Sequence, residues 1–484
     1  GGLSGLSAAW FLAQANRSVQ VTVLESSPRL GGWVDTRRLE DGAVLEAGPR
    51  TLRPNGIQGS VTLDLVHRLG LEKEVVAVPK SSPAARNRFI KFNGKLDKMP
   101  TSLTEALFPP SDHVFRGVLA RGALEPFVSR SGLRDESIHD FVSRRFGKHV
   151  AENMISALVH GIYAGDSRVL SVKSCFSVLW EAEQKHGSVV RSLVSAAFDK
   201  TPEKFPTDIS PESLAFIKRI KACSVYAFKN GLQTFTDAIR LDLEKNHPQI
   251  QIVSNAKATK LENTPNGIQV TTDSGSSISA SHVISSLPSH ALSPLLPVSS
   301  AIPPILNQTP FVDVAVVNLL FNDPNLLSIE GFGYLVPRTQ KSSVIGVIFD
   351  SVAVPGQDAR PATRLTCMMG GHRFKEVFPD GFSETQCLAL AREALRDDLG
   401  VRGDPVATRV SLQRQCIPQY TVGHAARMHG VHEALLGEFG GNLSVVGSSY
   451  LGVGVNDCVL SSKNVVQRLE EGAWDAGVTG LEKF

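Results

Sequence analysis

The sequence predicts an α/β fold in which a βαβ domain, assembled from separate stretches of the chain, is interleaved with an antiparallel sheet and a helical insert. Three observations predict this fold. A glycine-rich turn runs into a helix and a strand within residues 1–24, a helical pattern with few strand signals covers 107–197, and short apolar runs separated by turn residues follow from 312.

Composition limits the class of protein. The chain has 484 residues, of which 42% are hydrophobic and 20% charged, so it can bury sizeable cores and is neither disordered nor fibrous. Its net charge of +3 is too balanced for a protein whose main partner is nucleic acid. No apolar run approaches the roughly 18 residues that span a bilayer.

The cysteines indicate the redox compartment of the protein, and the first residue bears on whether the chain is complete. The 6 cysteines are scattered without close pairs, which argues against a disulfide framework and a cysteine-rich zinc site and suits a reducing compartment. The chain begins with Gly1 rather than methionine, without a recognisable targeting peptide. We therefore expect an N-terminally truncated fragment.

The first 25 residues predict the second half of a Rossmann-like βαβ unit. Gly1-Gly2-Leu3-Ser4-Gly5 leads into an apolar helix over 6–12 and a strand over 19–24, which ends at Glu25. Glycines let the backbone approach a pyrophosphate, the helix N-terminus offers N–H groups, and a carboxylate about 20 residues further on accepts hydrogen bonds from ribose. Gly2 and Gly5 would be the second and third glycines of the fingerprint. A plain glycine-rich turn is the alternative.

The segment after Glu25 favours a flavin over a nicotinamide cofactor. Ser26-Ser27-Pro28-Arg29-Leu30-Gly31-Gly32 forms a tight turn, a hairpin over 33–39 and 43–46 turns at Asp41-Gly42, and Gly48-Pro49-Arg50 follows. Together these segments resemble the FAD-containing amine oxidase superfamily. The resemblance implies cofactor contacts from Gly1, Gly2, Leu3, Ser4, Gly5, Glu25, Ser26, Arg29, Trp33, Gly48, Pro49, Arg50 and Thr51. For Arg29 and Arg50, surface charge is the alternative.

The helical insert carries an apolar stripe with arginines between its members. Val114, Phe115, Val118 and Leu119 form one stripe, and Leu124, Phe127 and Val128 follow it. Arg116, Arg121, Arg130 and Arg134 lie among these residues, opposed only by Glu125. A basic segment with an apolar face can lie in the interface of an anionic membrane, although a helix packed on its own domain fits the sequence equally well.

The rest of the chain is predicted to complete the first domain in two further stretches, with a second sheet between them. A loop over 199–211, a helix ending near 244, a strand at 250–253 and a hairpin over 268–278 lead to a strand at 283–288. Runs at 312–321, 333–336, 344–349 and 365–369 predict one antiparallel sheet, followed by a helix over 383–399 and a strand over 407–412. A last strand at 443–447 feeds a helix beginning near Asp457, whose N-terminus would stabilise negative charge on a reduced flavin.

Motifs along the whole chain narrow the resemblance. Asp135-Glu136-Ser137-Ile138-His139, Gly161-Ile162-Tyr163-Ala164-Gly165-Asp166, Ile417-Pro418-Gln419-Tyr420 and Gly452-Val453-Gly454-Val455-Asn456-Asp457 occur in this order. They resemble the protoporphyrinogen oxidases, particularly the animal mitochondrial type, from Gly1 to about Leu469. The resemblance implies oxidation of protoporphyrinogen IX to protoporphyrin IX in haem biosynthesis, with FAD as hydride acceptor and molecular oxygen reduced to hydrogen peroxide. Six electrons are removed.

The resemblance also implies a domain division and further site residues. The FAD-binding domain takes 1–84, 201–300 and 435–472, the substrate domain 85–106 and 301–434, the membrane-binding helices 107–200, and a tail 473–484. Ala258, Ser448, Val453, Gly454 and Val455 would contact the flavin, Arg88 a propionate, and Phe332, Gly333, Leu335 and Met368 the macrocycle. No cysteine occurs in 448–455, so the FAD is expected to be non-covalent. No catalytic side chain is predicted, and His139, His160 and His424 are interpreted as packing residues.

By resemblance, the protein would bind monotopically to the mitochondrial inner membrane on its intermembrane-space side, with a homodimer and a contact with the next haem-pathway enzyme left open. Another FAD-dependent amine oxidase or carotenoid desaturase is the enzymatic alternative, and a non-catalytic prenyl-binding escort protein of the same fold is the other. Without the first strand of the βαβ unit, we expect the chain to bind FAD weakly or to fold poorly.

Overall fold

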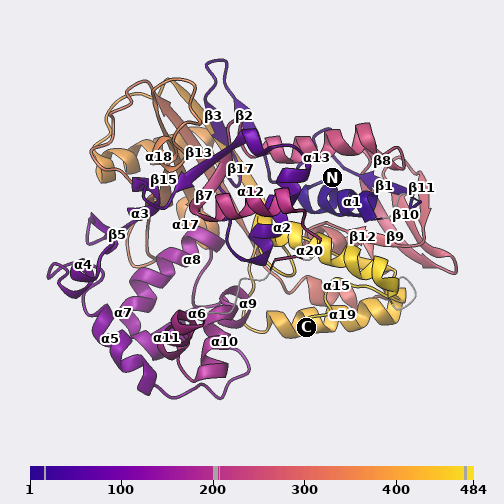
Figure 1. The fold of residues 1–484 in the computed structure, drawn as a ribbon, viewed down its shortest axis with the longest axis horizontal. Helices are drawn as coiled ribbons and strands as arrows, with labels where there is room; N and C mark the ends of the chain where they lie inside the picture. The colour runs from indigo at the N-terminus through magenta and orange to yellow at the C-terminus, as the bar shows by residue number, and fades with distance from the viewer. Residues whose placement is uncertain (16–17, 200–204, 207, 474–476) are drawn as a thin grey trace.

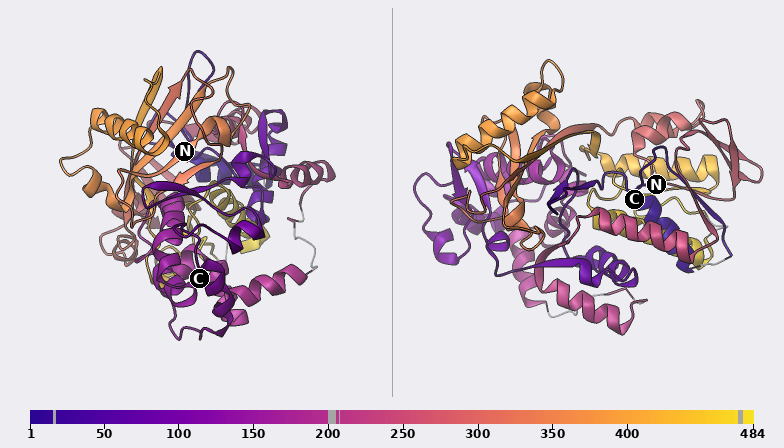
Figure 2. Two further views of the ribbon diagram at one scale, coloured as in Figure 1. Left: turned by 90° about the vertical axis from the view of Figure 1, so that its left-hand side faces the viewer. Right: turned by 90° about the horizontal axis from the view of Figure 1, so that it is seen from above.

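The structure, a computed structural model, describes residues 1–15, 18–199, 205–206, 208–473 and 477–484. It divides into three parts (Figure 1): a nucleotide-binding domain on the right, a seven-stranded sheet at the upper left and a helical insert at the lower left. The two views of Figure 2 show the sheet, in orange, and the insert, in purple to magenta, on the same side of the nucleotide-binding domain.

The nucleotide-binding domain is assembled from stretches far apart in the sequence. Its first stretch contains α1 (Leu3–Ala15), β1 (Val21–Leu24), β2 (Thr36–Arg38), β3 (Val44–Glu46), α2 (Gly56–Arg68), η1 (Glu72–Glu74) and β4 (Val75–Pro79). The second contains α12 (Pro211–Lys221), β7 (Cys223–Phe228), α13 (Gln233–Asn246), β8 (Ile250–Val253), β9 (Ala258–Thr264), β10 (Gly267–Thr272), β11 (Ser277–Ala280), β12 (Val283–Ser285), α14 (Ser289–Leu292), η4 (Ser293–Leu295) and α15 (Ile302–Leu306). The last contains α19 (His424–Phe439), β18 (Leu443–Val445), α20 (Val455–Arg468) and η6 (Leu469–Ala473).

Parallel pairing joins these stretches. β1 pairs with β8, and β12 pairs with β18, both in parallel. β9, β10 and β11 form an antiparallel meander, while β2–β3 is the hairpin predicted at Asp41-Gly42. The Rossmann-like arrangement is thus confirmed, with α1 beginning at Leu3, so that the glycine-rich turn reaches into its first turn.

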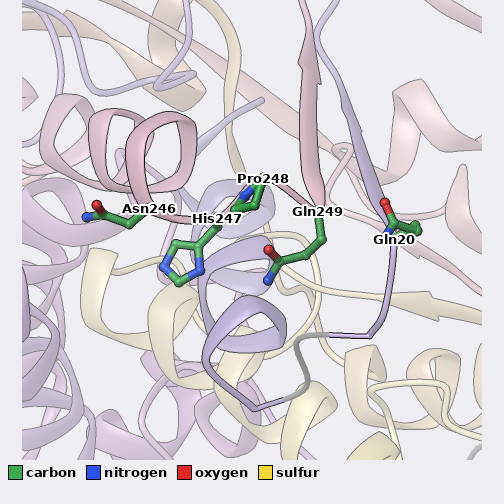
Figure 3. Close-up of a pocket in the computed structure, with 5 residues that line it drawn as sticks. All are labelled: Gln20, Asn246, His247, Pro248 and Gln249. Atoms are coloured by element: carbon green, nitrogen blue, oxygen red, sulfur yellow. The ribbon is translucent and has the colours of Figure 1, made fainter.

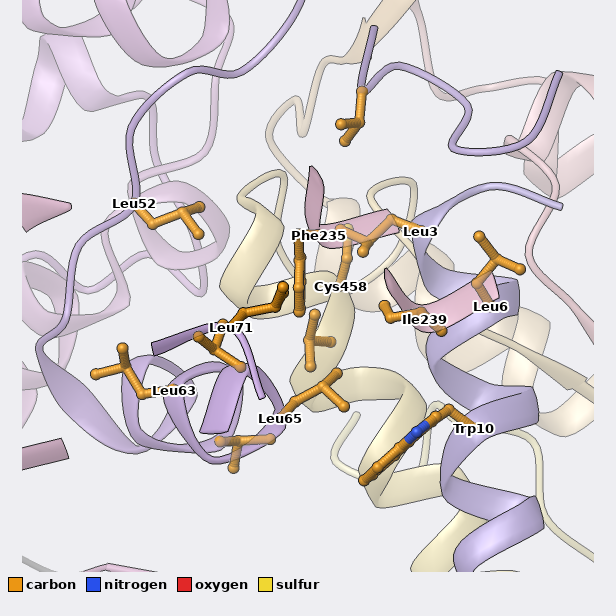
Figure 4. Packing of buried hydrophobic residues seen from close by; sticks show 14 of the residues in the cluster. Leu3, Leu6, Trp10, Leu52, Leu63, Leu65, Leu71, Phe235, Ile239 and Cys458 are labelled. Carbon is orange, nitrogen blue, oxygen red and sulfur yellow. The ribbon is translucent and has the colours of Figure 1, made fainter. Parts of the chain in front are cut away.

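Small and apolar side chains explain the burial of α1. Its Leu6, Ala9 and Trp10 are buried on the side of α13, while Ala8 and Leu12 pack against Val466 of α20. Figure 4 shows the resulting core, in which α1 and α2 meet Phe235 and Ile239 of α13 and Cys458 of α20. A helix apolar on nearly every side belongs inside a protein.

The second part is a sheet in the order β17-β13-β16-β15-β14-β5-β6. Its elements are α3 (Pro83–Arg86), β5 (Phe89–Phe92), β6 (Lys95–Lys98), β13 (Phe311–Phe321), β14 (Gly333–Leu335), β15 (Val344–Phe349), α16 (Asp350–Ala353), β16 (Thr363–Gly370), η5 (Gly371–Arg373), α17 (Phe374–Val377), α18 (Glu384–Leu399) and β17 (Ala407–Pro418). The prediction of a purely antiparallel sheet was wrong at one place, because β5 and β14 pair in parallel. The long stretch of chain between them supplies the crossover that parallel strands need.

The two faces of this sheet differ. One face carries every second residue of the strands and packs against Ala391 and Leu395 of α18; its residues include Tyr334, Val347, Leu365 and Cys367. The neighbouring positions, including Leu335 and Met368, lie on the opposite face, towards the helical insert. One face therefore packs on α18, and the other faces the insert and packs on it.

The third part is helical, as predicted. It contains α4 (Leu103–Leu107), α5 (Val118–Leu124), η2 (Glu125–Phe127), α6 (Ile138–Phe146), α7 (Lys148–Val150), η3 (Ala151–Ile155), α8 (Ser156–Tyr163), α9 (Val172–Cys175), α10 (Ser177–His186) and α11 (Val189–Phe198). Throughout the described residues, no helix has both the length and the apolar character needed to cross a bilayer.

The predicted stripe over 114–119 does not form one face, because Val114 is fully buried whereas Leu119 is 38% exposed. Of the apolar residues that follow it, Leu124 is 59% and Phe127 is 82% exposed. Glu125 does not oppose the neighbouring arginines, because it points inward to Arg145. The sequence interval contains a turn and a change of helix type at 125, which rotates successive side chains to different sides.

Two of the predicted domain boundaries differ from the divisions seen in the structure. Position 434 lies inside α19, whose Met428, Val431, Leu435 and Phe439 pack as one unit in the nucleotide-binding domain. The described part of the predicted tail, 477–484, is packed rather than free: the Val445 N–H donates to Thr479 O at 2.9 Å, beside β18. The loop predicted over 199–211 lies partly outside the described residues.

A buried ionic network holds the insert together. Arg145 donates to Glu125 and, at 2.7 Å, to Glu183, and the side chains of all three are fully buried. The backbone N–H groups of Val189 and Val190 also donate to Glu125, at 3.0 and 3.1 Å. Burial opposes ionisation of Glu125, but the Ser188 hydroxyl, these N–H groups and Arg145 outweigh it and hold the pKa of Glu125 below its usual value.

We expect Glu125→Ala to destabilise the insert by about 3–5 kcal/mol, because it removes one of the two carboxylates paired with the buried Arg145 and leaves the Val189 and Val190 N–H groups without their acceptor. Since the Glu125 pKa is lowered on folding, its contribution is complete above the unfolded pKa of about 4.3 and is lost as pH falls below it. Denaturant unfolding at pH 7 and pH 4 measures both effects. Arg134→Ala, at an exposed position, is the control; equal stability of the two variants would contradict the account.

Candidate functional site

Two glycine-rich segments face each other at the N-terminus of α1. Gly2 and Gly31 form a parallel bridge, and the Gly31 N–H donates to Gly1 O at 2.9 Å. A Cβ at Gly2 would meet only Gly32, at 3.7 Å, so that side of the backbone is open. The helix N-terminus and the open glycine backbone form a cradle of the kind that holds a diphosphate.

The third glycine of the fingerprint has a packing role. A Cβ at Gly5 would lie 2.7 Å from Ser286 Oγ, just after β12, and one at Gly447, after β18, would lie 3.3 Å from Ser4 Oγ. α1 therefore lies directly against the carboxyl ends of β12 and β18. Nucleotides bind at this end of parallel strands.

Glu25 ends β1 beside this cradle. Its Oε1 accepts hydrogen bonds from the Ser27 N–H at 2.8 Å and the Ser27 hydroxyl at 2.9 Å, and the Ser26 hydroxyl lies 3.3 Å away. Partial burial opposes ionisation, but these bonds and the nearby chain amino group hold the Glu25 pKa below its usual value. An ionised carboxylate at this place suits the ribose contact predicted from the sequence. Ala256 donates its N–H to Glu25 O at 2.8 Å, which places the chain leading to Ala258 alongside.

Arg29 stabilises the glycine turn. It donates to the carbonyls of Leu30 at 3.1 Å, Gly32 at 2.5 Å and Val34 at 2.8 Å. It thus shapes the turn opposite Gly2, and its predicted contact with the diphosphate stays a prediction.

The segment from Gly48 to Thr51 connects the cradle to the sheet. A Cβ at Gly48 would lie 2.0 Å from Trp33 O, so only glycine allows this approach. Arg50 is buried and forms an ion pair of 2.7 Å with Asp350, which begins α16 directly after β15. Its Nη2 is buried with no partner among the described residues, which leaves a donor for a ligand. Pro49 and Thr51, on either side, are partly exposed.

Glu46 lies beside this ion pair and was not singled out from the sequence. It accepts hydrogen bonds from Thr36 Oγ1 at 2.7 Å and from the Leu232 N–H at 2.6 Å. Burial outweighs these bonds and raises the pKa of Glu46 to about 7.

The loop before α20 reaches the same place. Asn456 Nδ2 donates to Arg53 O at 2.7 Å, so the N-terminus of α20 lies next to the segment containing Arg50. Val453, Gly454 and Val455 are partly exposed there, and the Gly454 N–H donates to Asp457 at 3.2 Å. Ser448, at the start of the loop, is fixed by its carbonyl, which accepts from the Tyr420 hydroxyl.

Three of the residues predicted to meet the substrate, Gly333, Leu335 and Met368, lie on one face of the sheet, and Phe332 and Arg88 directly precede β14 and β5. Leu335 packs near α8, because a Cβ at Gly161 would lie 2.9 Å from it, and Met368 packs beside Ala164. Gly333 shares this face but has a structural reason to be glycine, since its φ is 138° and a Cβ would lie 2.1 Å from Val347 O. Phe332 lies under the guanidinium of Arg88, 5.1 Å from it.

The buried histidines have structural partners. His160 Nδ1 lies 2.6 Å from Val336 O, and His424 Nε2 lies 3.0 Å from Tyr450 O. Burial lowers the pKa of each to about 4. His139 donates its backbone N–H to Ser167 O at 2.9 Å. Among the described residues, no cluster of three His, Cys, Asp or Glu side chains is arranged to hold a metal ion.

Two surface pockets lie away from these residues. One, of about 390 Å³, is lined by Gln20, Asn246, His247, Pro248 and Gln249 (Figure 3). It lies before β1 and β8, at the amino ends of these strands, where nucleotides do not bind. The other, of about 420 Å³, is lined by parts of 324–330 and 349–364. Neither contains a predicted site residue.

Comparison with known proteins points to one family. The family described as flavin containing amine oxidoreductase matches residues 3–469. The chain is 37% identical over 469 residues to protoporphyrinogen oxidase of Homo sapiens, covering 96% of this chain and 95% of that protein. It is 27% identical over 480 residues to coproporphyrinogen III oxidase of Bacillus subtilis, covering 96% of both. A solved structure from Exiguobacterium sp. 255-15 superposes with a TM-score of 0.76 at 24% identity, covering 98% of this chain and 97% of that one.

The residues at the site fit a flavin nucleotide. The open side of Gly2 leaves room for a diphosphate, Glu25 is an ionised acceptor, and Arg50 has a buried donor without a partner among the described residues. The N-terminus of α20 adds partial positive charge close to Arg50. Gly2 and Glu25 lie at the carboxyl ends of the parallel strands, whereas Arg50 pairs with Asp350 directly after β15, so the four features extend from the cradle to the sheet.

Gly48→Ala is expected to lower the amount of bound flavin at least about tenfold, because the new Cβ must displace the Trp33 backbone. The flavin absorbance per mole of purified protein measures this effect, and far-UV circular dichroism checks that the chain is folded. Gly437→Ala is the control, since nothing lies within 4 Å of its Cβ. Full flavin content in folded Gly48→Ala would contradict the assignment.

Proposed function

Because the chain belongs to the flavin-containing amine oxidoreductase family, among its protoporphyrinogen oxidases, we propose that it oxidises protoporphyrinogen IX to protoporphyrin IX with bound FAD. Molecular oxygen would be the final acceptor, and hydrogen peroxide the second product. The observation that carries this proposal is Arg88, a half-buried cation stacked on Phe332 without a carboxylate partner in the described chain, next to an apolar sheet face.

Non-covalent FAD fits the chemistry of the cofactor loop. The nearest cysteine in sequence, Cys458, lies within α20, and burial raises the pKa of its thiol to about 12. A thiol kept protonated at neutral pH is a poor nucleophile for attachment to a flavin. FAD, when bound, supplies the hydride acceptor, and three rounds would remove six electrons.

The protein itself would mainly orient the substrate and keep water away. Leu335 and Met368, both partly exposed, would offer an apolar surface for the macrocycle, and the guanidinium of Arg88 would offer a counter-charge for a propionate. His160 and His424 are buried and have a low pKa, so neither is proposed as a proton acceptor. We assign no catalytic residue.

Two alternatives make different predictions. Another amine oxidase or a carotenoid desaturase would not be reduced by a porphyrinogen, and an escort protein of the same fold would carry no functional flavin. The visible spectrum of the purified protein identifies the escort protein, which would show no flavin, and anaerobic mixing of flavin-loaded protein with protoporphyrinogen IX separates the two enzymes. We expect bleaching of the flavin absorbance and appearance of porphyrin fluorescence; absence of bleaching would contradict the proposal.

Arg88→Ala is expected to raise KM for protoporphyrinogen IX roughly ten- to hundredfold with unchanged flavin content, because a charge-assisted contact is lost. Initial rates of porphyrin fluorescence under air measure this change. A variant with the normal KM would show that Arg88 does not contact the substrate.

We also propose a monotopic contact of the helical insert with a membrane surface. Large apolar side chains protrude from α4, η2, α10 and α11; they include Leu103, Phe108, Phe127, Val178, Leu193 and Phe198. Phe198 is 79% exposed, and exposed apolar residues are concentrated in this part of the chain. The arginines at 121 and 134 are also exposed and could meet anionic lipid. Placement on the intermembrane-space side of the mitochondrial inner membrane, a homodimer and a contact with the next enzyme of the haem pathway remain predictions from the family resemblance.

Replacing Leu193 and Phe198 by serine is expected to weaken binding to anionic vesicles at least about tenfold, since two large apolar side chains no longer leave water. Vesicle co-sedimentation measures the change. Val298→Ser, at a fully exposed position outside the insert, is the control. Equal binding of all three proteins would refute the assignment of this surface.

A further inference from the structure

Arg53 has a fixed backbone and an unengaged side chain. Leu52, directly before it, exchanges backbone hydrogen bonds with Tyr226 at 2.8 and 2.9 Å, and Arg53 O accepts from Asn456 at 2.7 Å. β7 and α20 therefore hold this position from both sides. The Arg53 side chain is exposed and makes no hydrogen bond or ion pair within the described part of the chain.

Arg88 is in a similar state on the neighbouring element. Its guanidinium lies 5.1 Å from the centre of the Phe332 ring. The Phe332 N–H donates to Asn87 O at 3.1 Å, which holds the backbone directly before Arg88 against Phe332. Phe332 packs against a cluster that includes Ala227 of β7, and the neighbouring Tyr226 holds Leu52, so β7 brings the two arginines to one place. Consistent with this placement, burial and, next, the positive charge of Arg53 lower the pKa of Arg88, and no carboxylate among the described residues counteracts them.

This arrangement costs free energy in the empty protein. Two like charges lie near each other, one of them is half-buried, and no described acidic side chain neutralises either. By contrast, Arg50, three positions before Arg53, is paired with Asp350. Guanidinium groups without a partner among the described residues, beside the ring of the partly exposed Phe332, suit an anionic, flat ligand.

We propose that Arg53 and Arg88 form a two-cation site in which each guanidinium binds one carboxylate of a dicarboxylic tetrapyrrole. Arg53 is then a second substrate-binding residue, contributed by the nucleotide-binding domain, while Arg88 and Phe332 come from the sheet. The inference rests on the proposed function and deepens it, because it assigns both propionates of protoporphyrinogen IX. The substrate would bridge the two domains across the cofactor site.

The test uses fluorescence titration to measure how tightly the flavin-loaded protein binds protoporphyrin IX and its dimethyl ester, which lacks carboxylates. Arg53→Ala should bind the diacid at least roughly tenfold more weakly than the parent protein and bind the diester equally well. Arg53→Lys should restore part of the affinity, and Arg53→Ala should raise KM for protoporphyrinogen IX by a similar factor. Flavin content should be unchanged.

Arg402→Ala is the matched control, because Arg402 is exposed, has no partner among the described residues and follows α18 on the other face of the sheet. Unchanged diacid binding by Arg53→Ala, an equal loss for diacid and diester, or a loss of flavin would overturn the inference. Failure of the parent protein to bind porphyrin or oxidise protoporphyrinogen IX would instead overturn the proposed function.

Discussion

The ion pair between Arg50 and Asp350 is the contact on which the geometry of the site depends. It joins the loop after β3 to the end of β15, and both side chains are buried. The Thr366 hydroxyl lies 2.6 Å from Asp350 Oδ2 and 2.9 Å from Asn318 Oδ1 and can donate to either, and Asn318 donates to Glu46 O at 3.1 Å. Because removal of either charge would leave the other buried and unpaired, this network fixes the nucleotide-binding domain against the sheet.

Local signals in the sequence were enough for much of the fold. Glycines before a small-residue helix predicted the N-terminus of α1, Asp41-Gly42 predicted the β2–β3 hairpin, and Ser383, whose hydroxyl accepts from the Gln386 N–H at 3.4 Å, marked the start of α18. Contacts between distant positions could not be predicted in this way. The parallel pairing of β5 with β14 and the inward direction of Glu125 depend on residues far along the chain.

The site shows the same difference between local sequence signals and contacts of residues far apart in the chain. Family resemblance placed Gly2, Gly5, Glu25 and Arg50 in the cofactor region, and the structure brings the first three to one end of the parallel strands and Arg50 to the junction with the sheet. The sequence did not point to Asp350, because a carboxylate after a strand gives no indication of the residue with which it will pair. It also did not point to Arg53, whose significance arises only from its closeness to Arg88.

The central claim is that a flavin and a flat dicarboxylic substrate share the junction between the nucleotide-binding domain and the sheet. A crystal structure of the FAD-loaded protein with protoporphyrin IX tests it most directly. The account predicts the porphyrin against the face that carries Leu335 and Met368, with its carboxylates at Arg88 and Arg53. A porphyrin bound elsewhere, or a junction filled by side chains in the loaded protein, would contradict it.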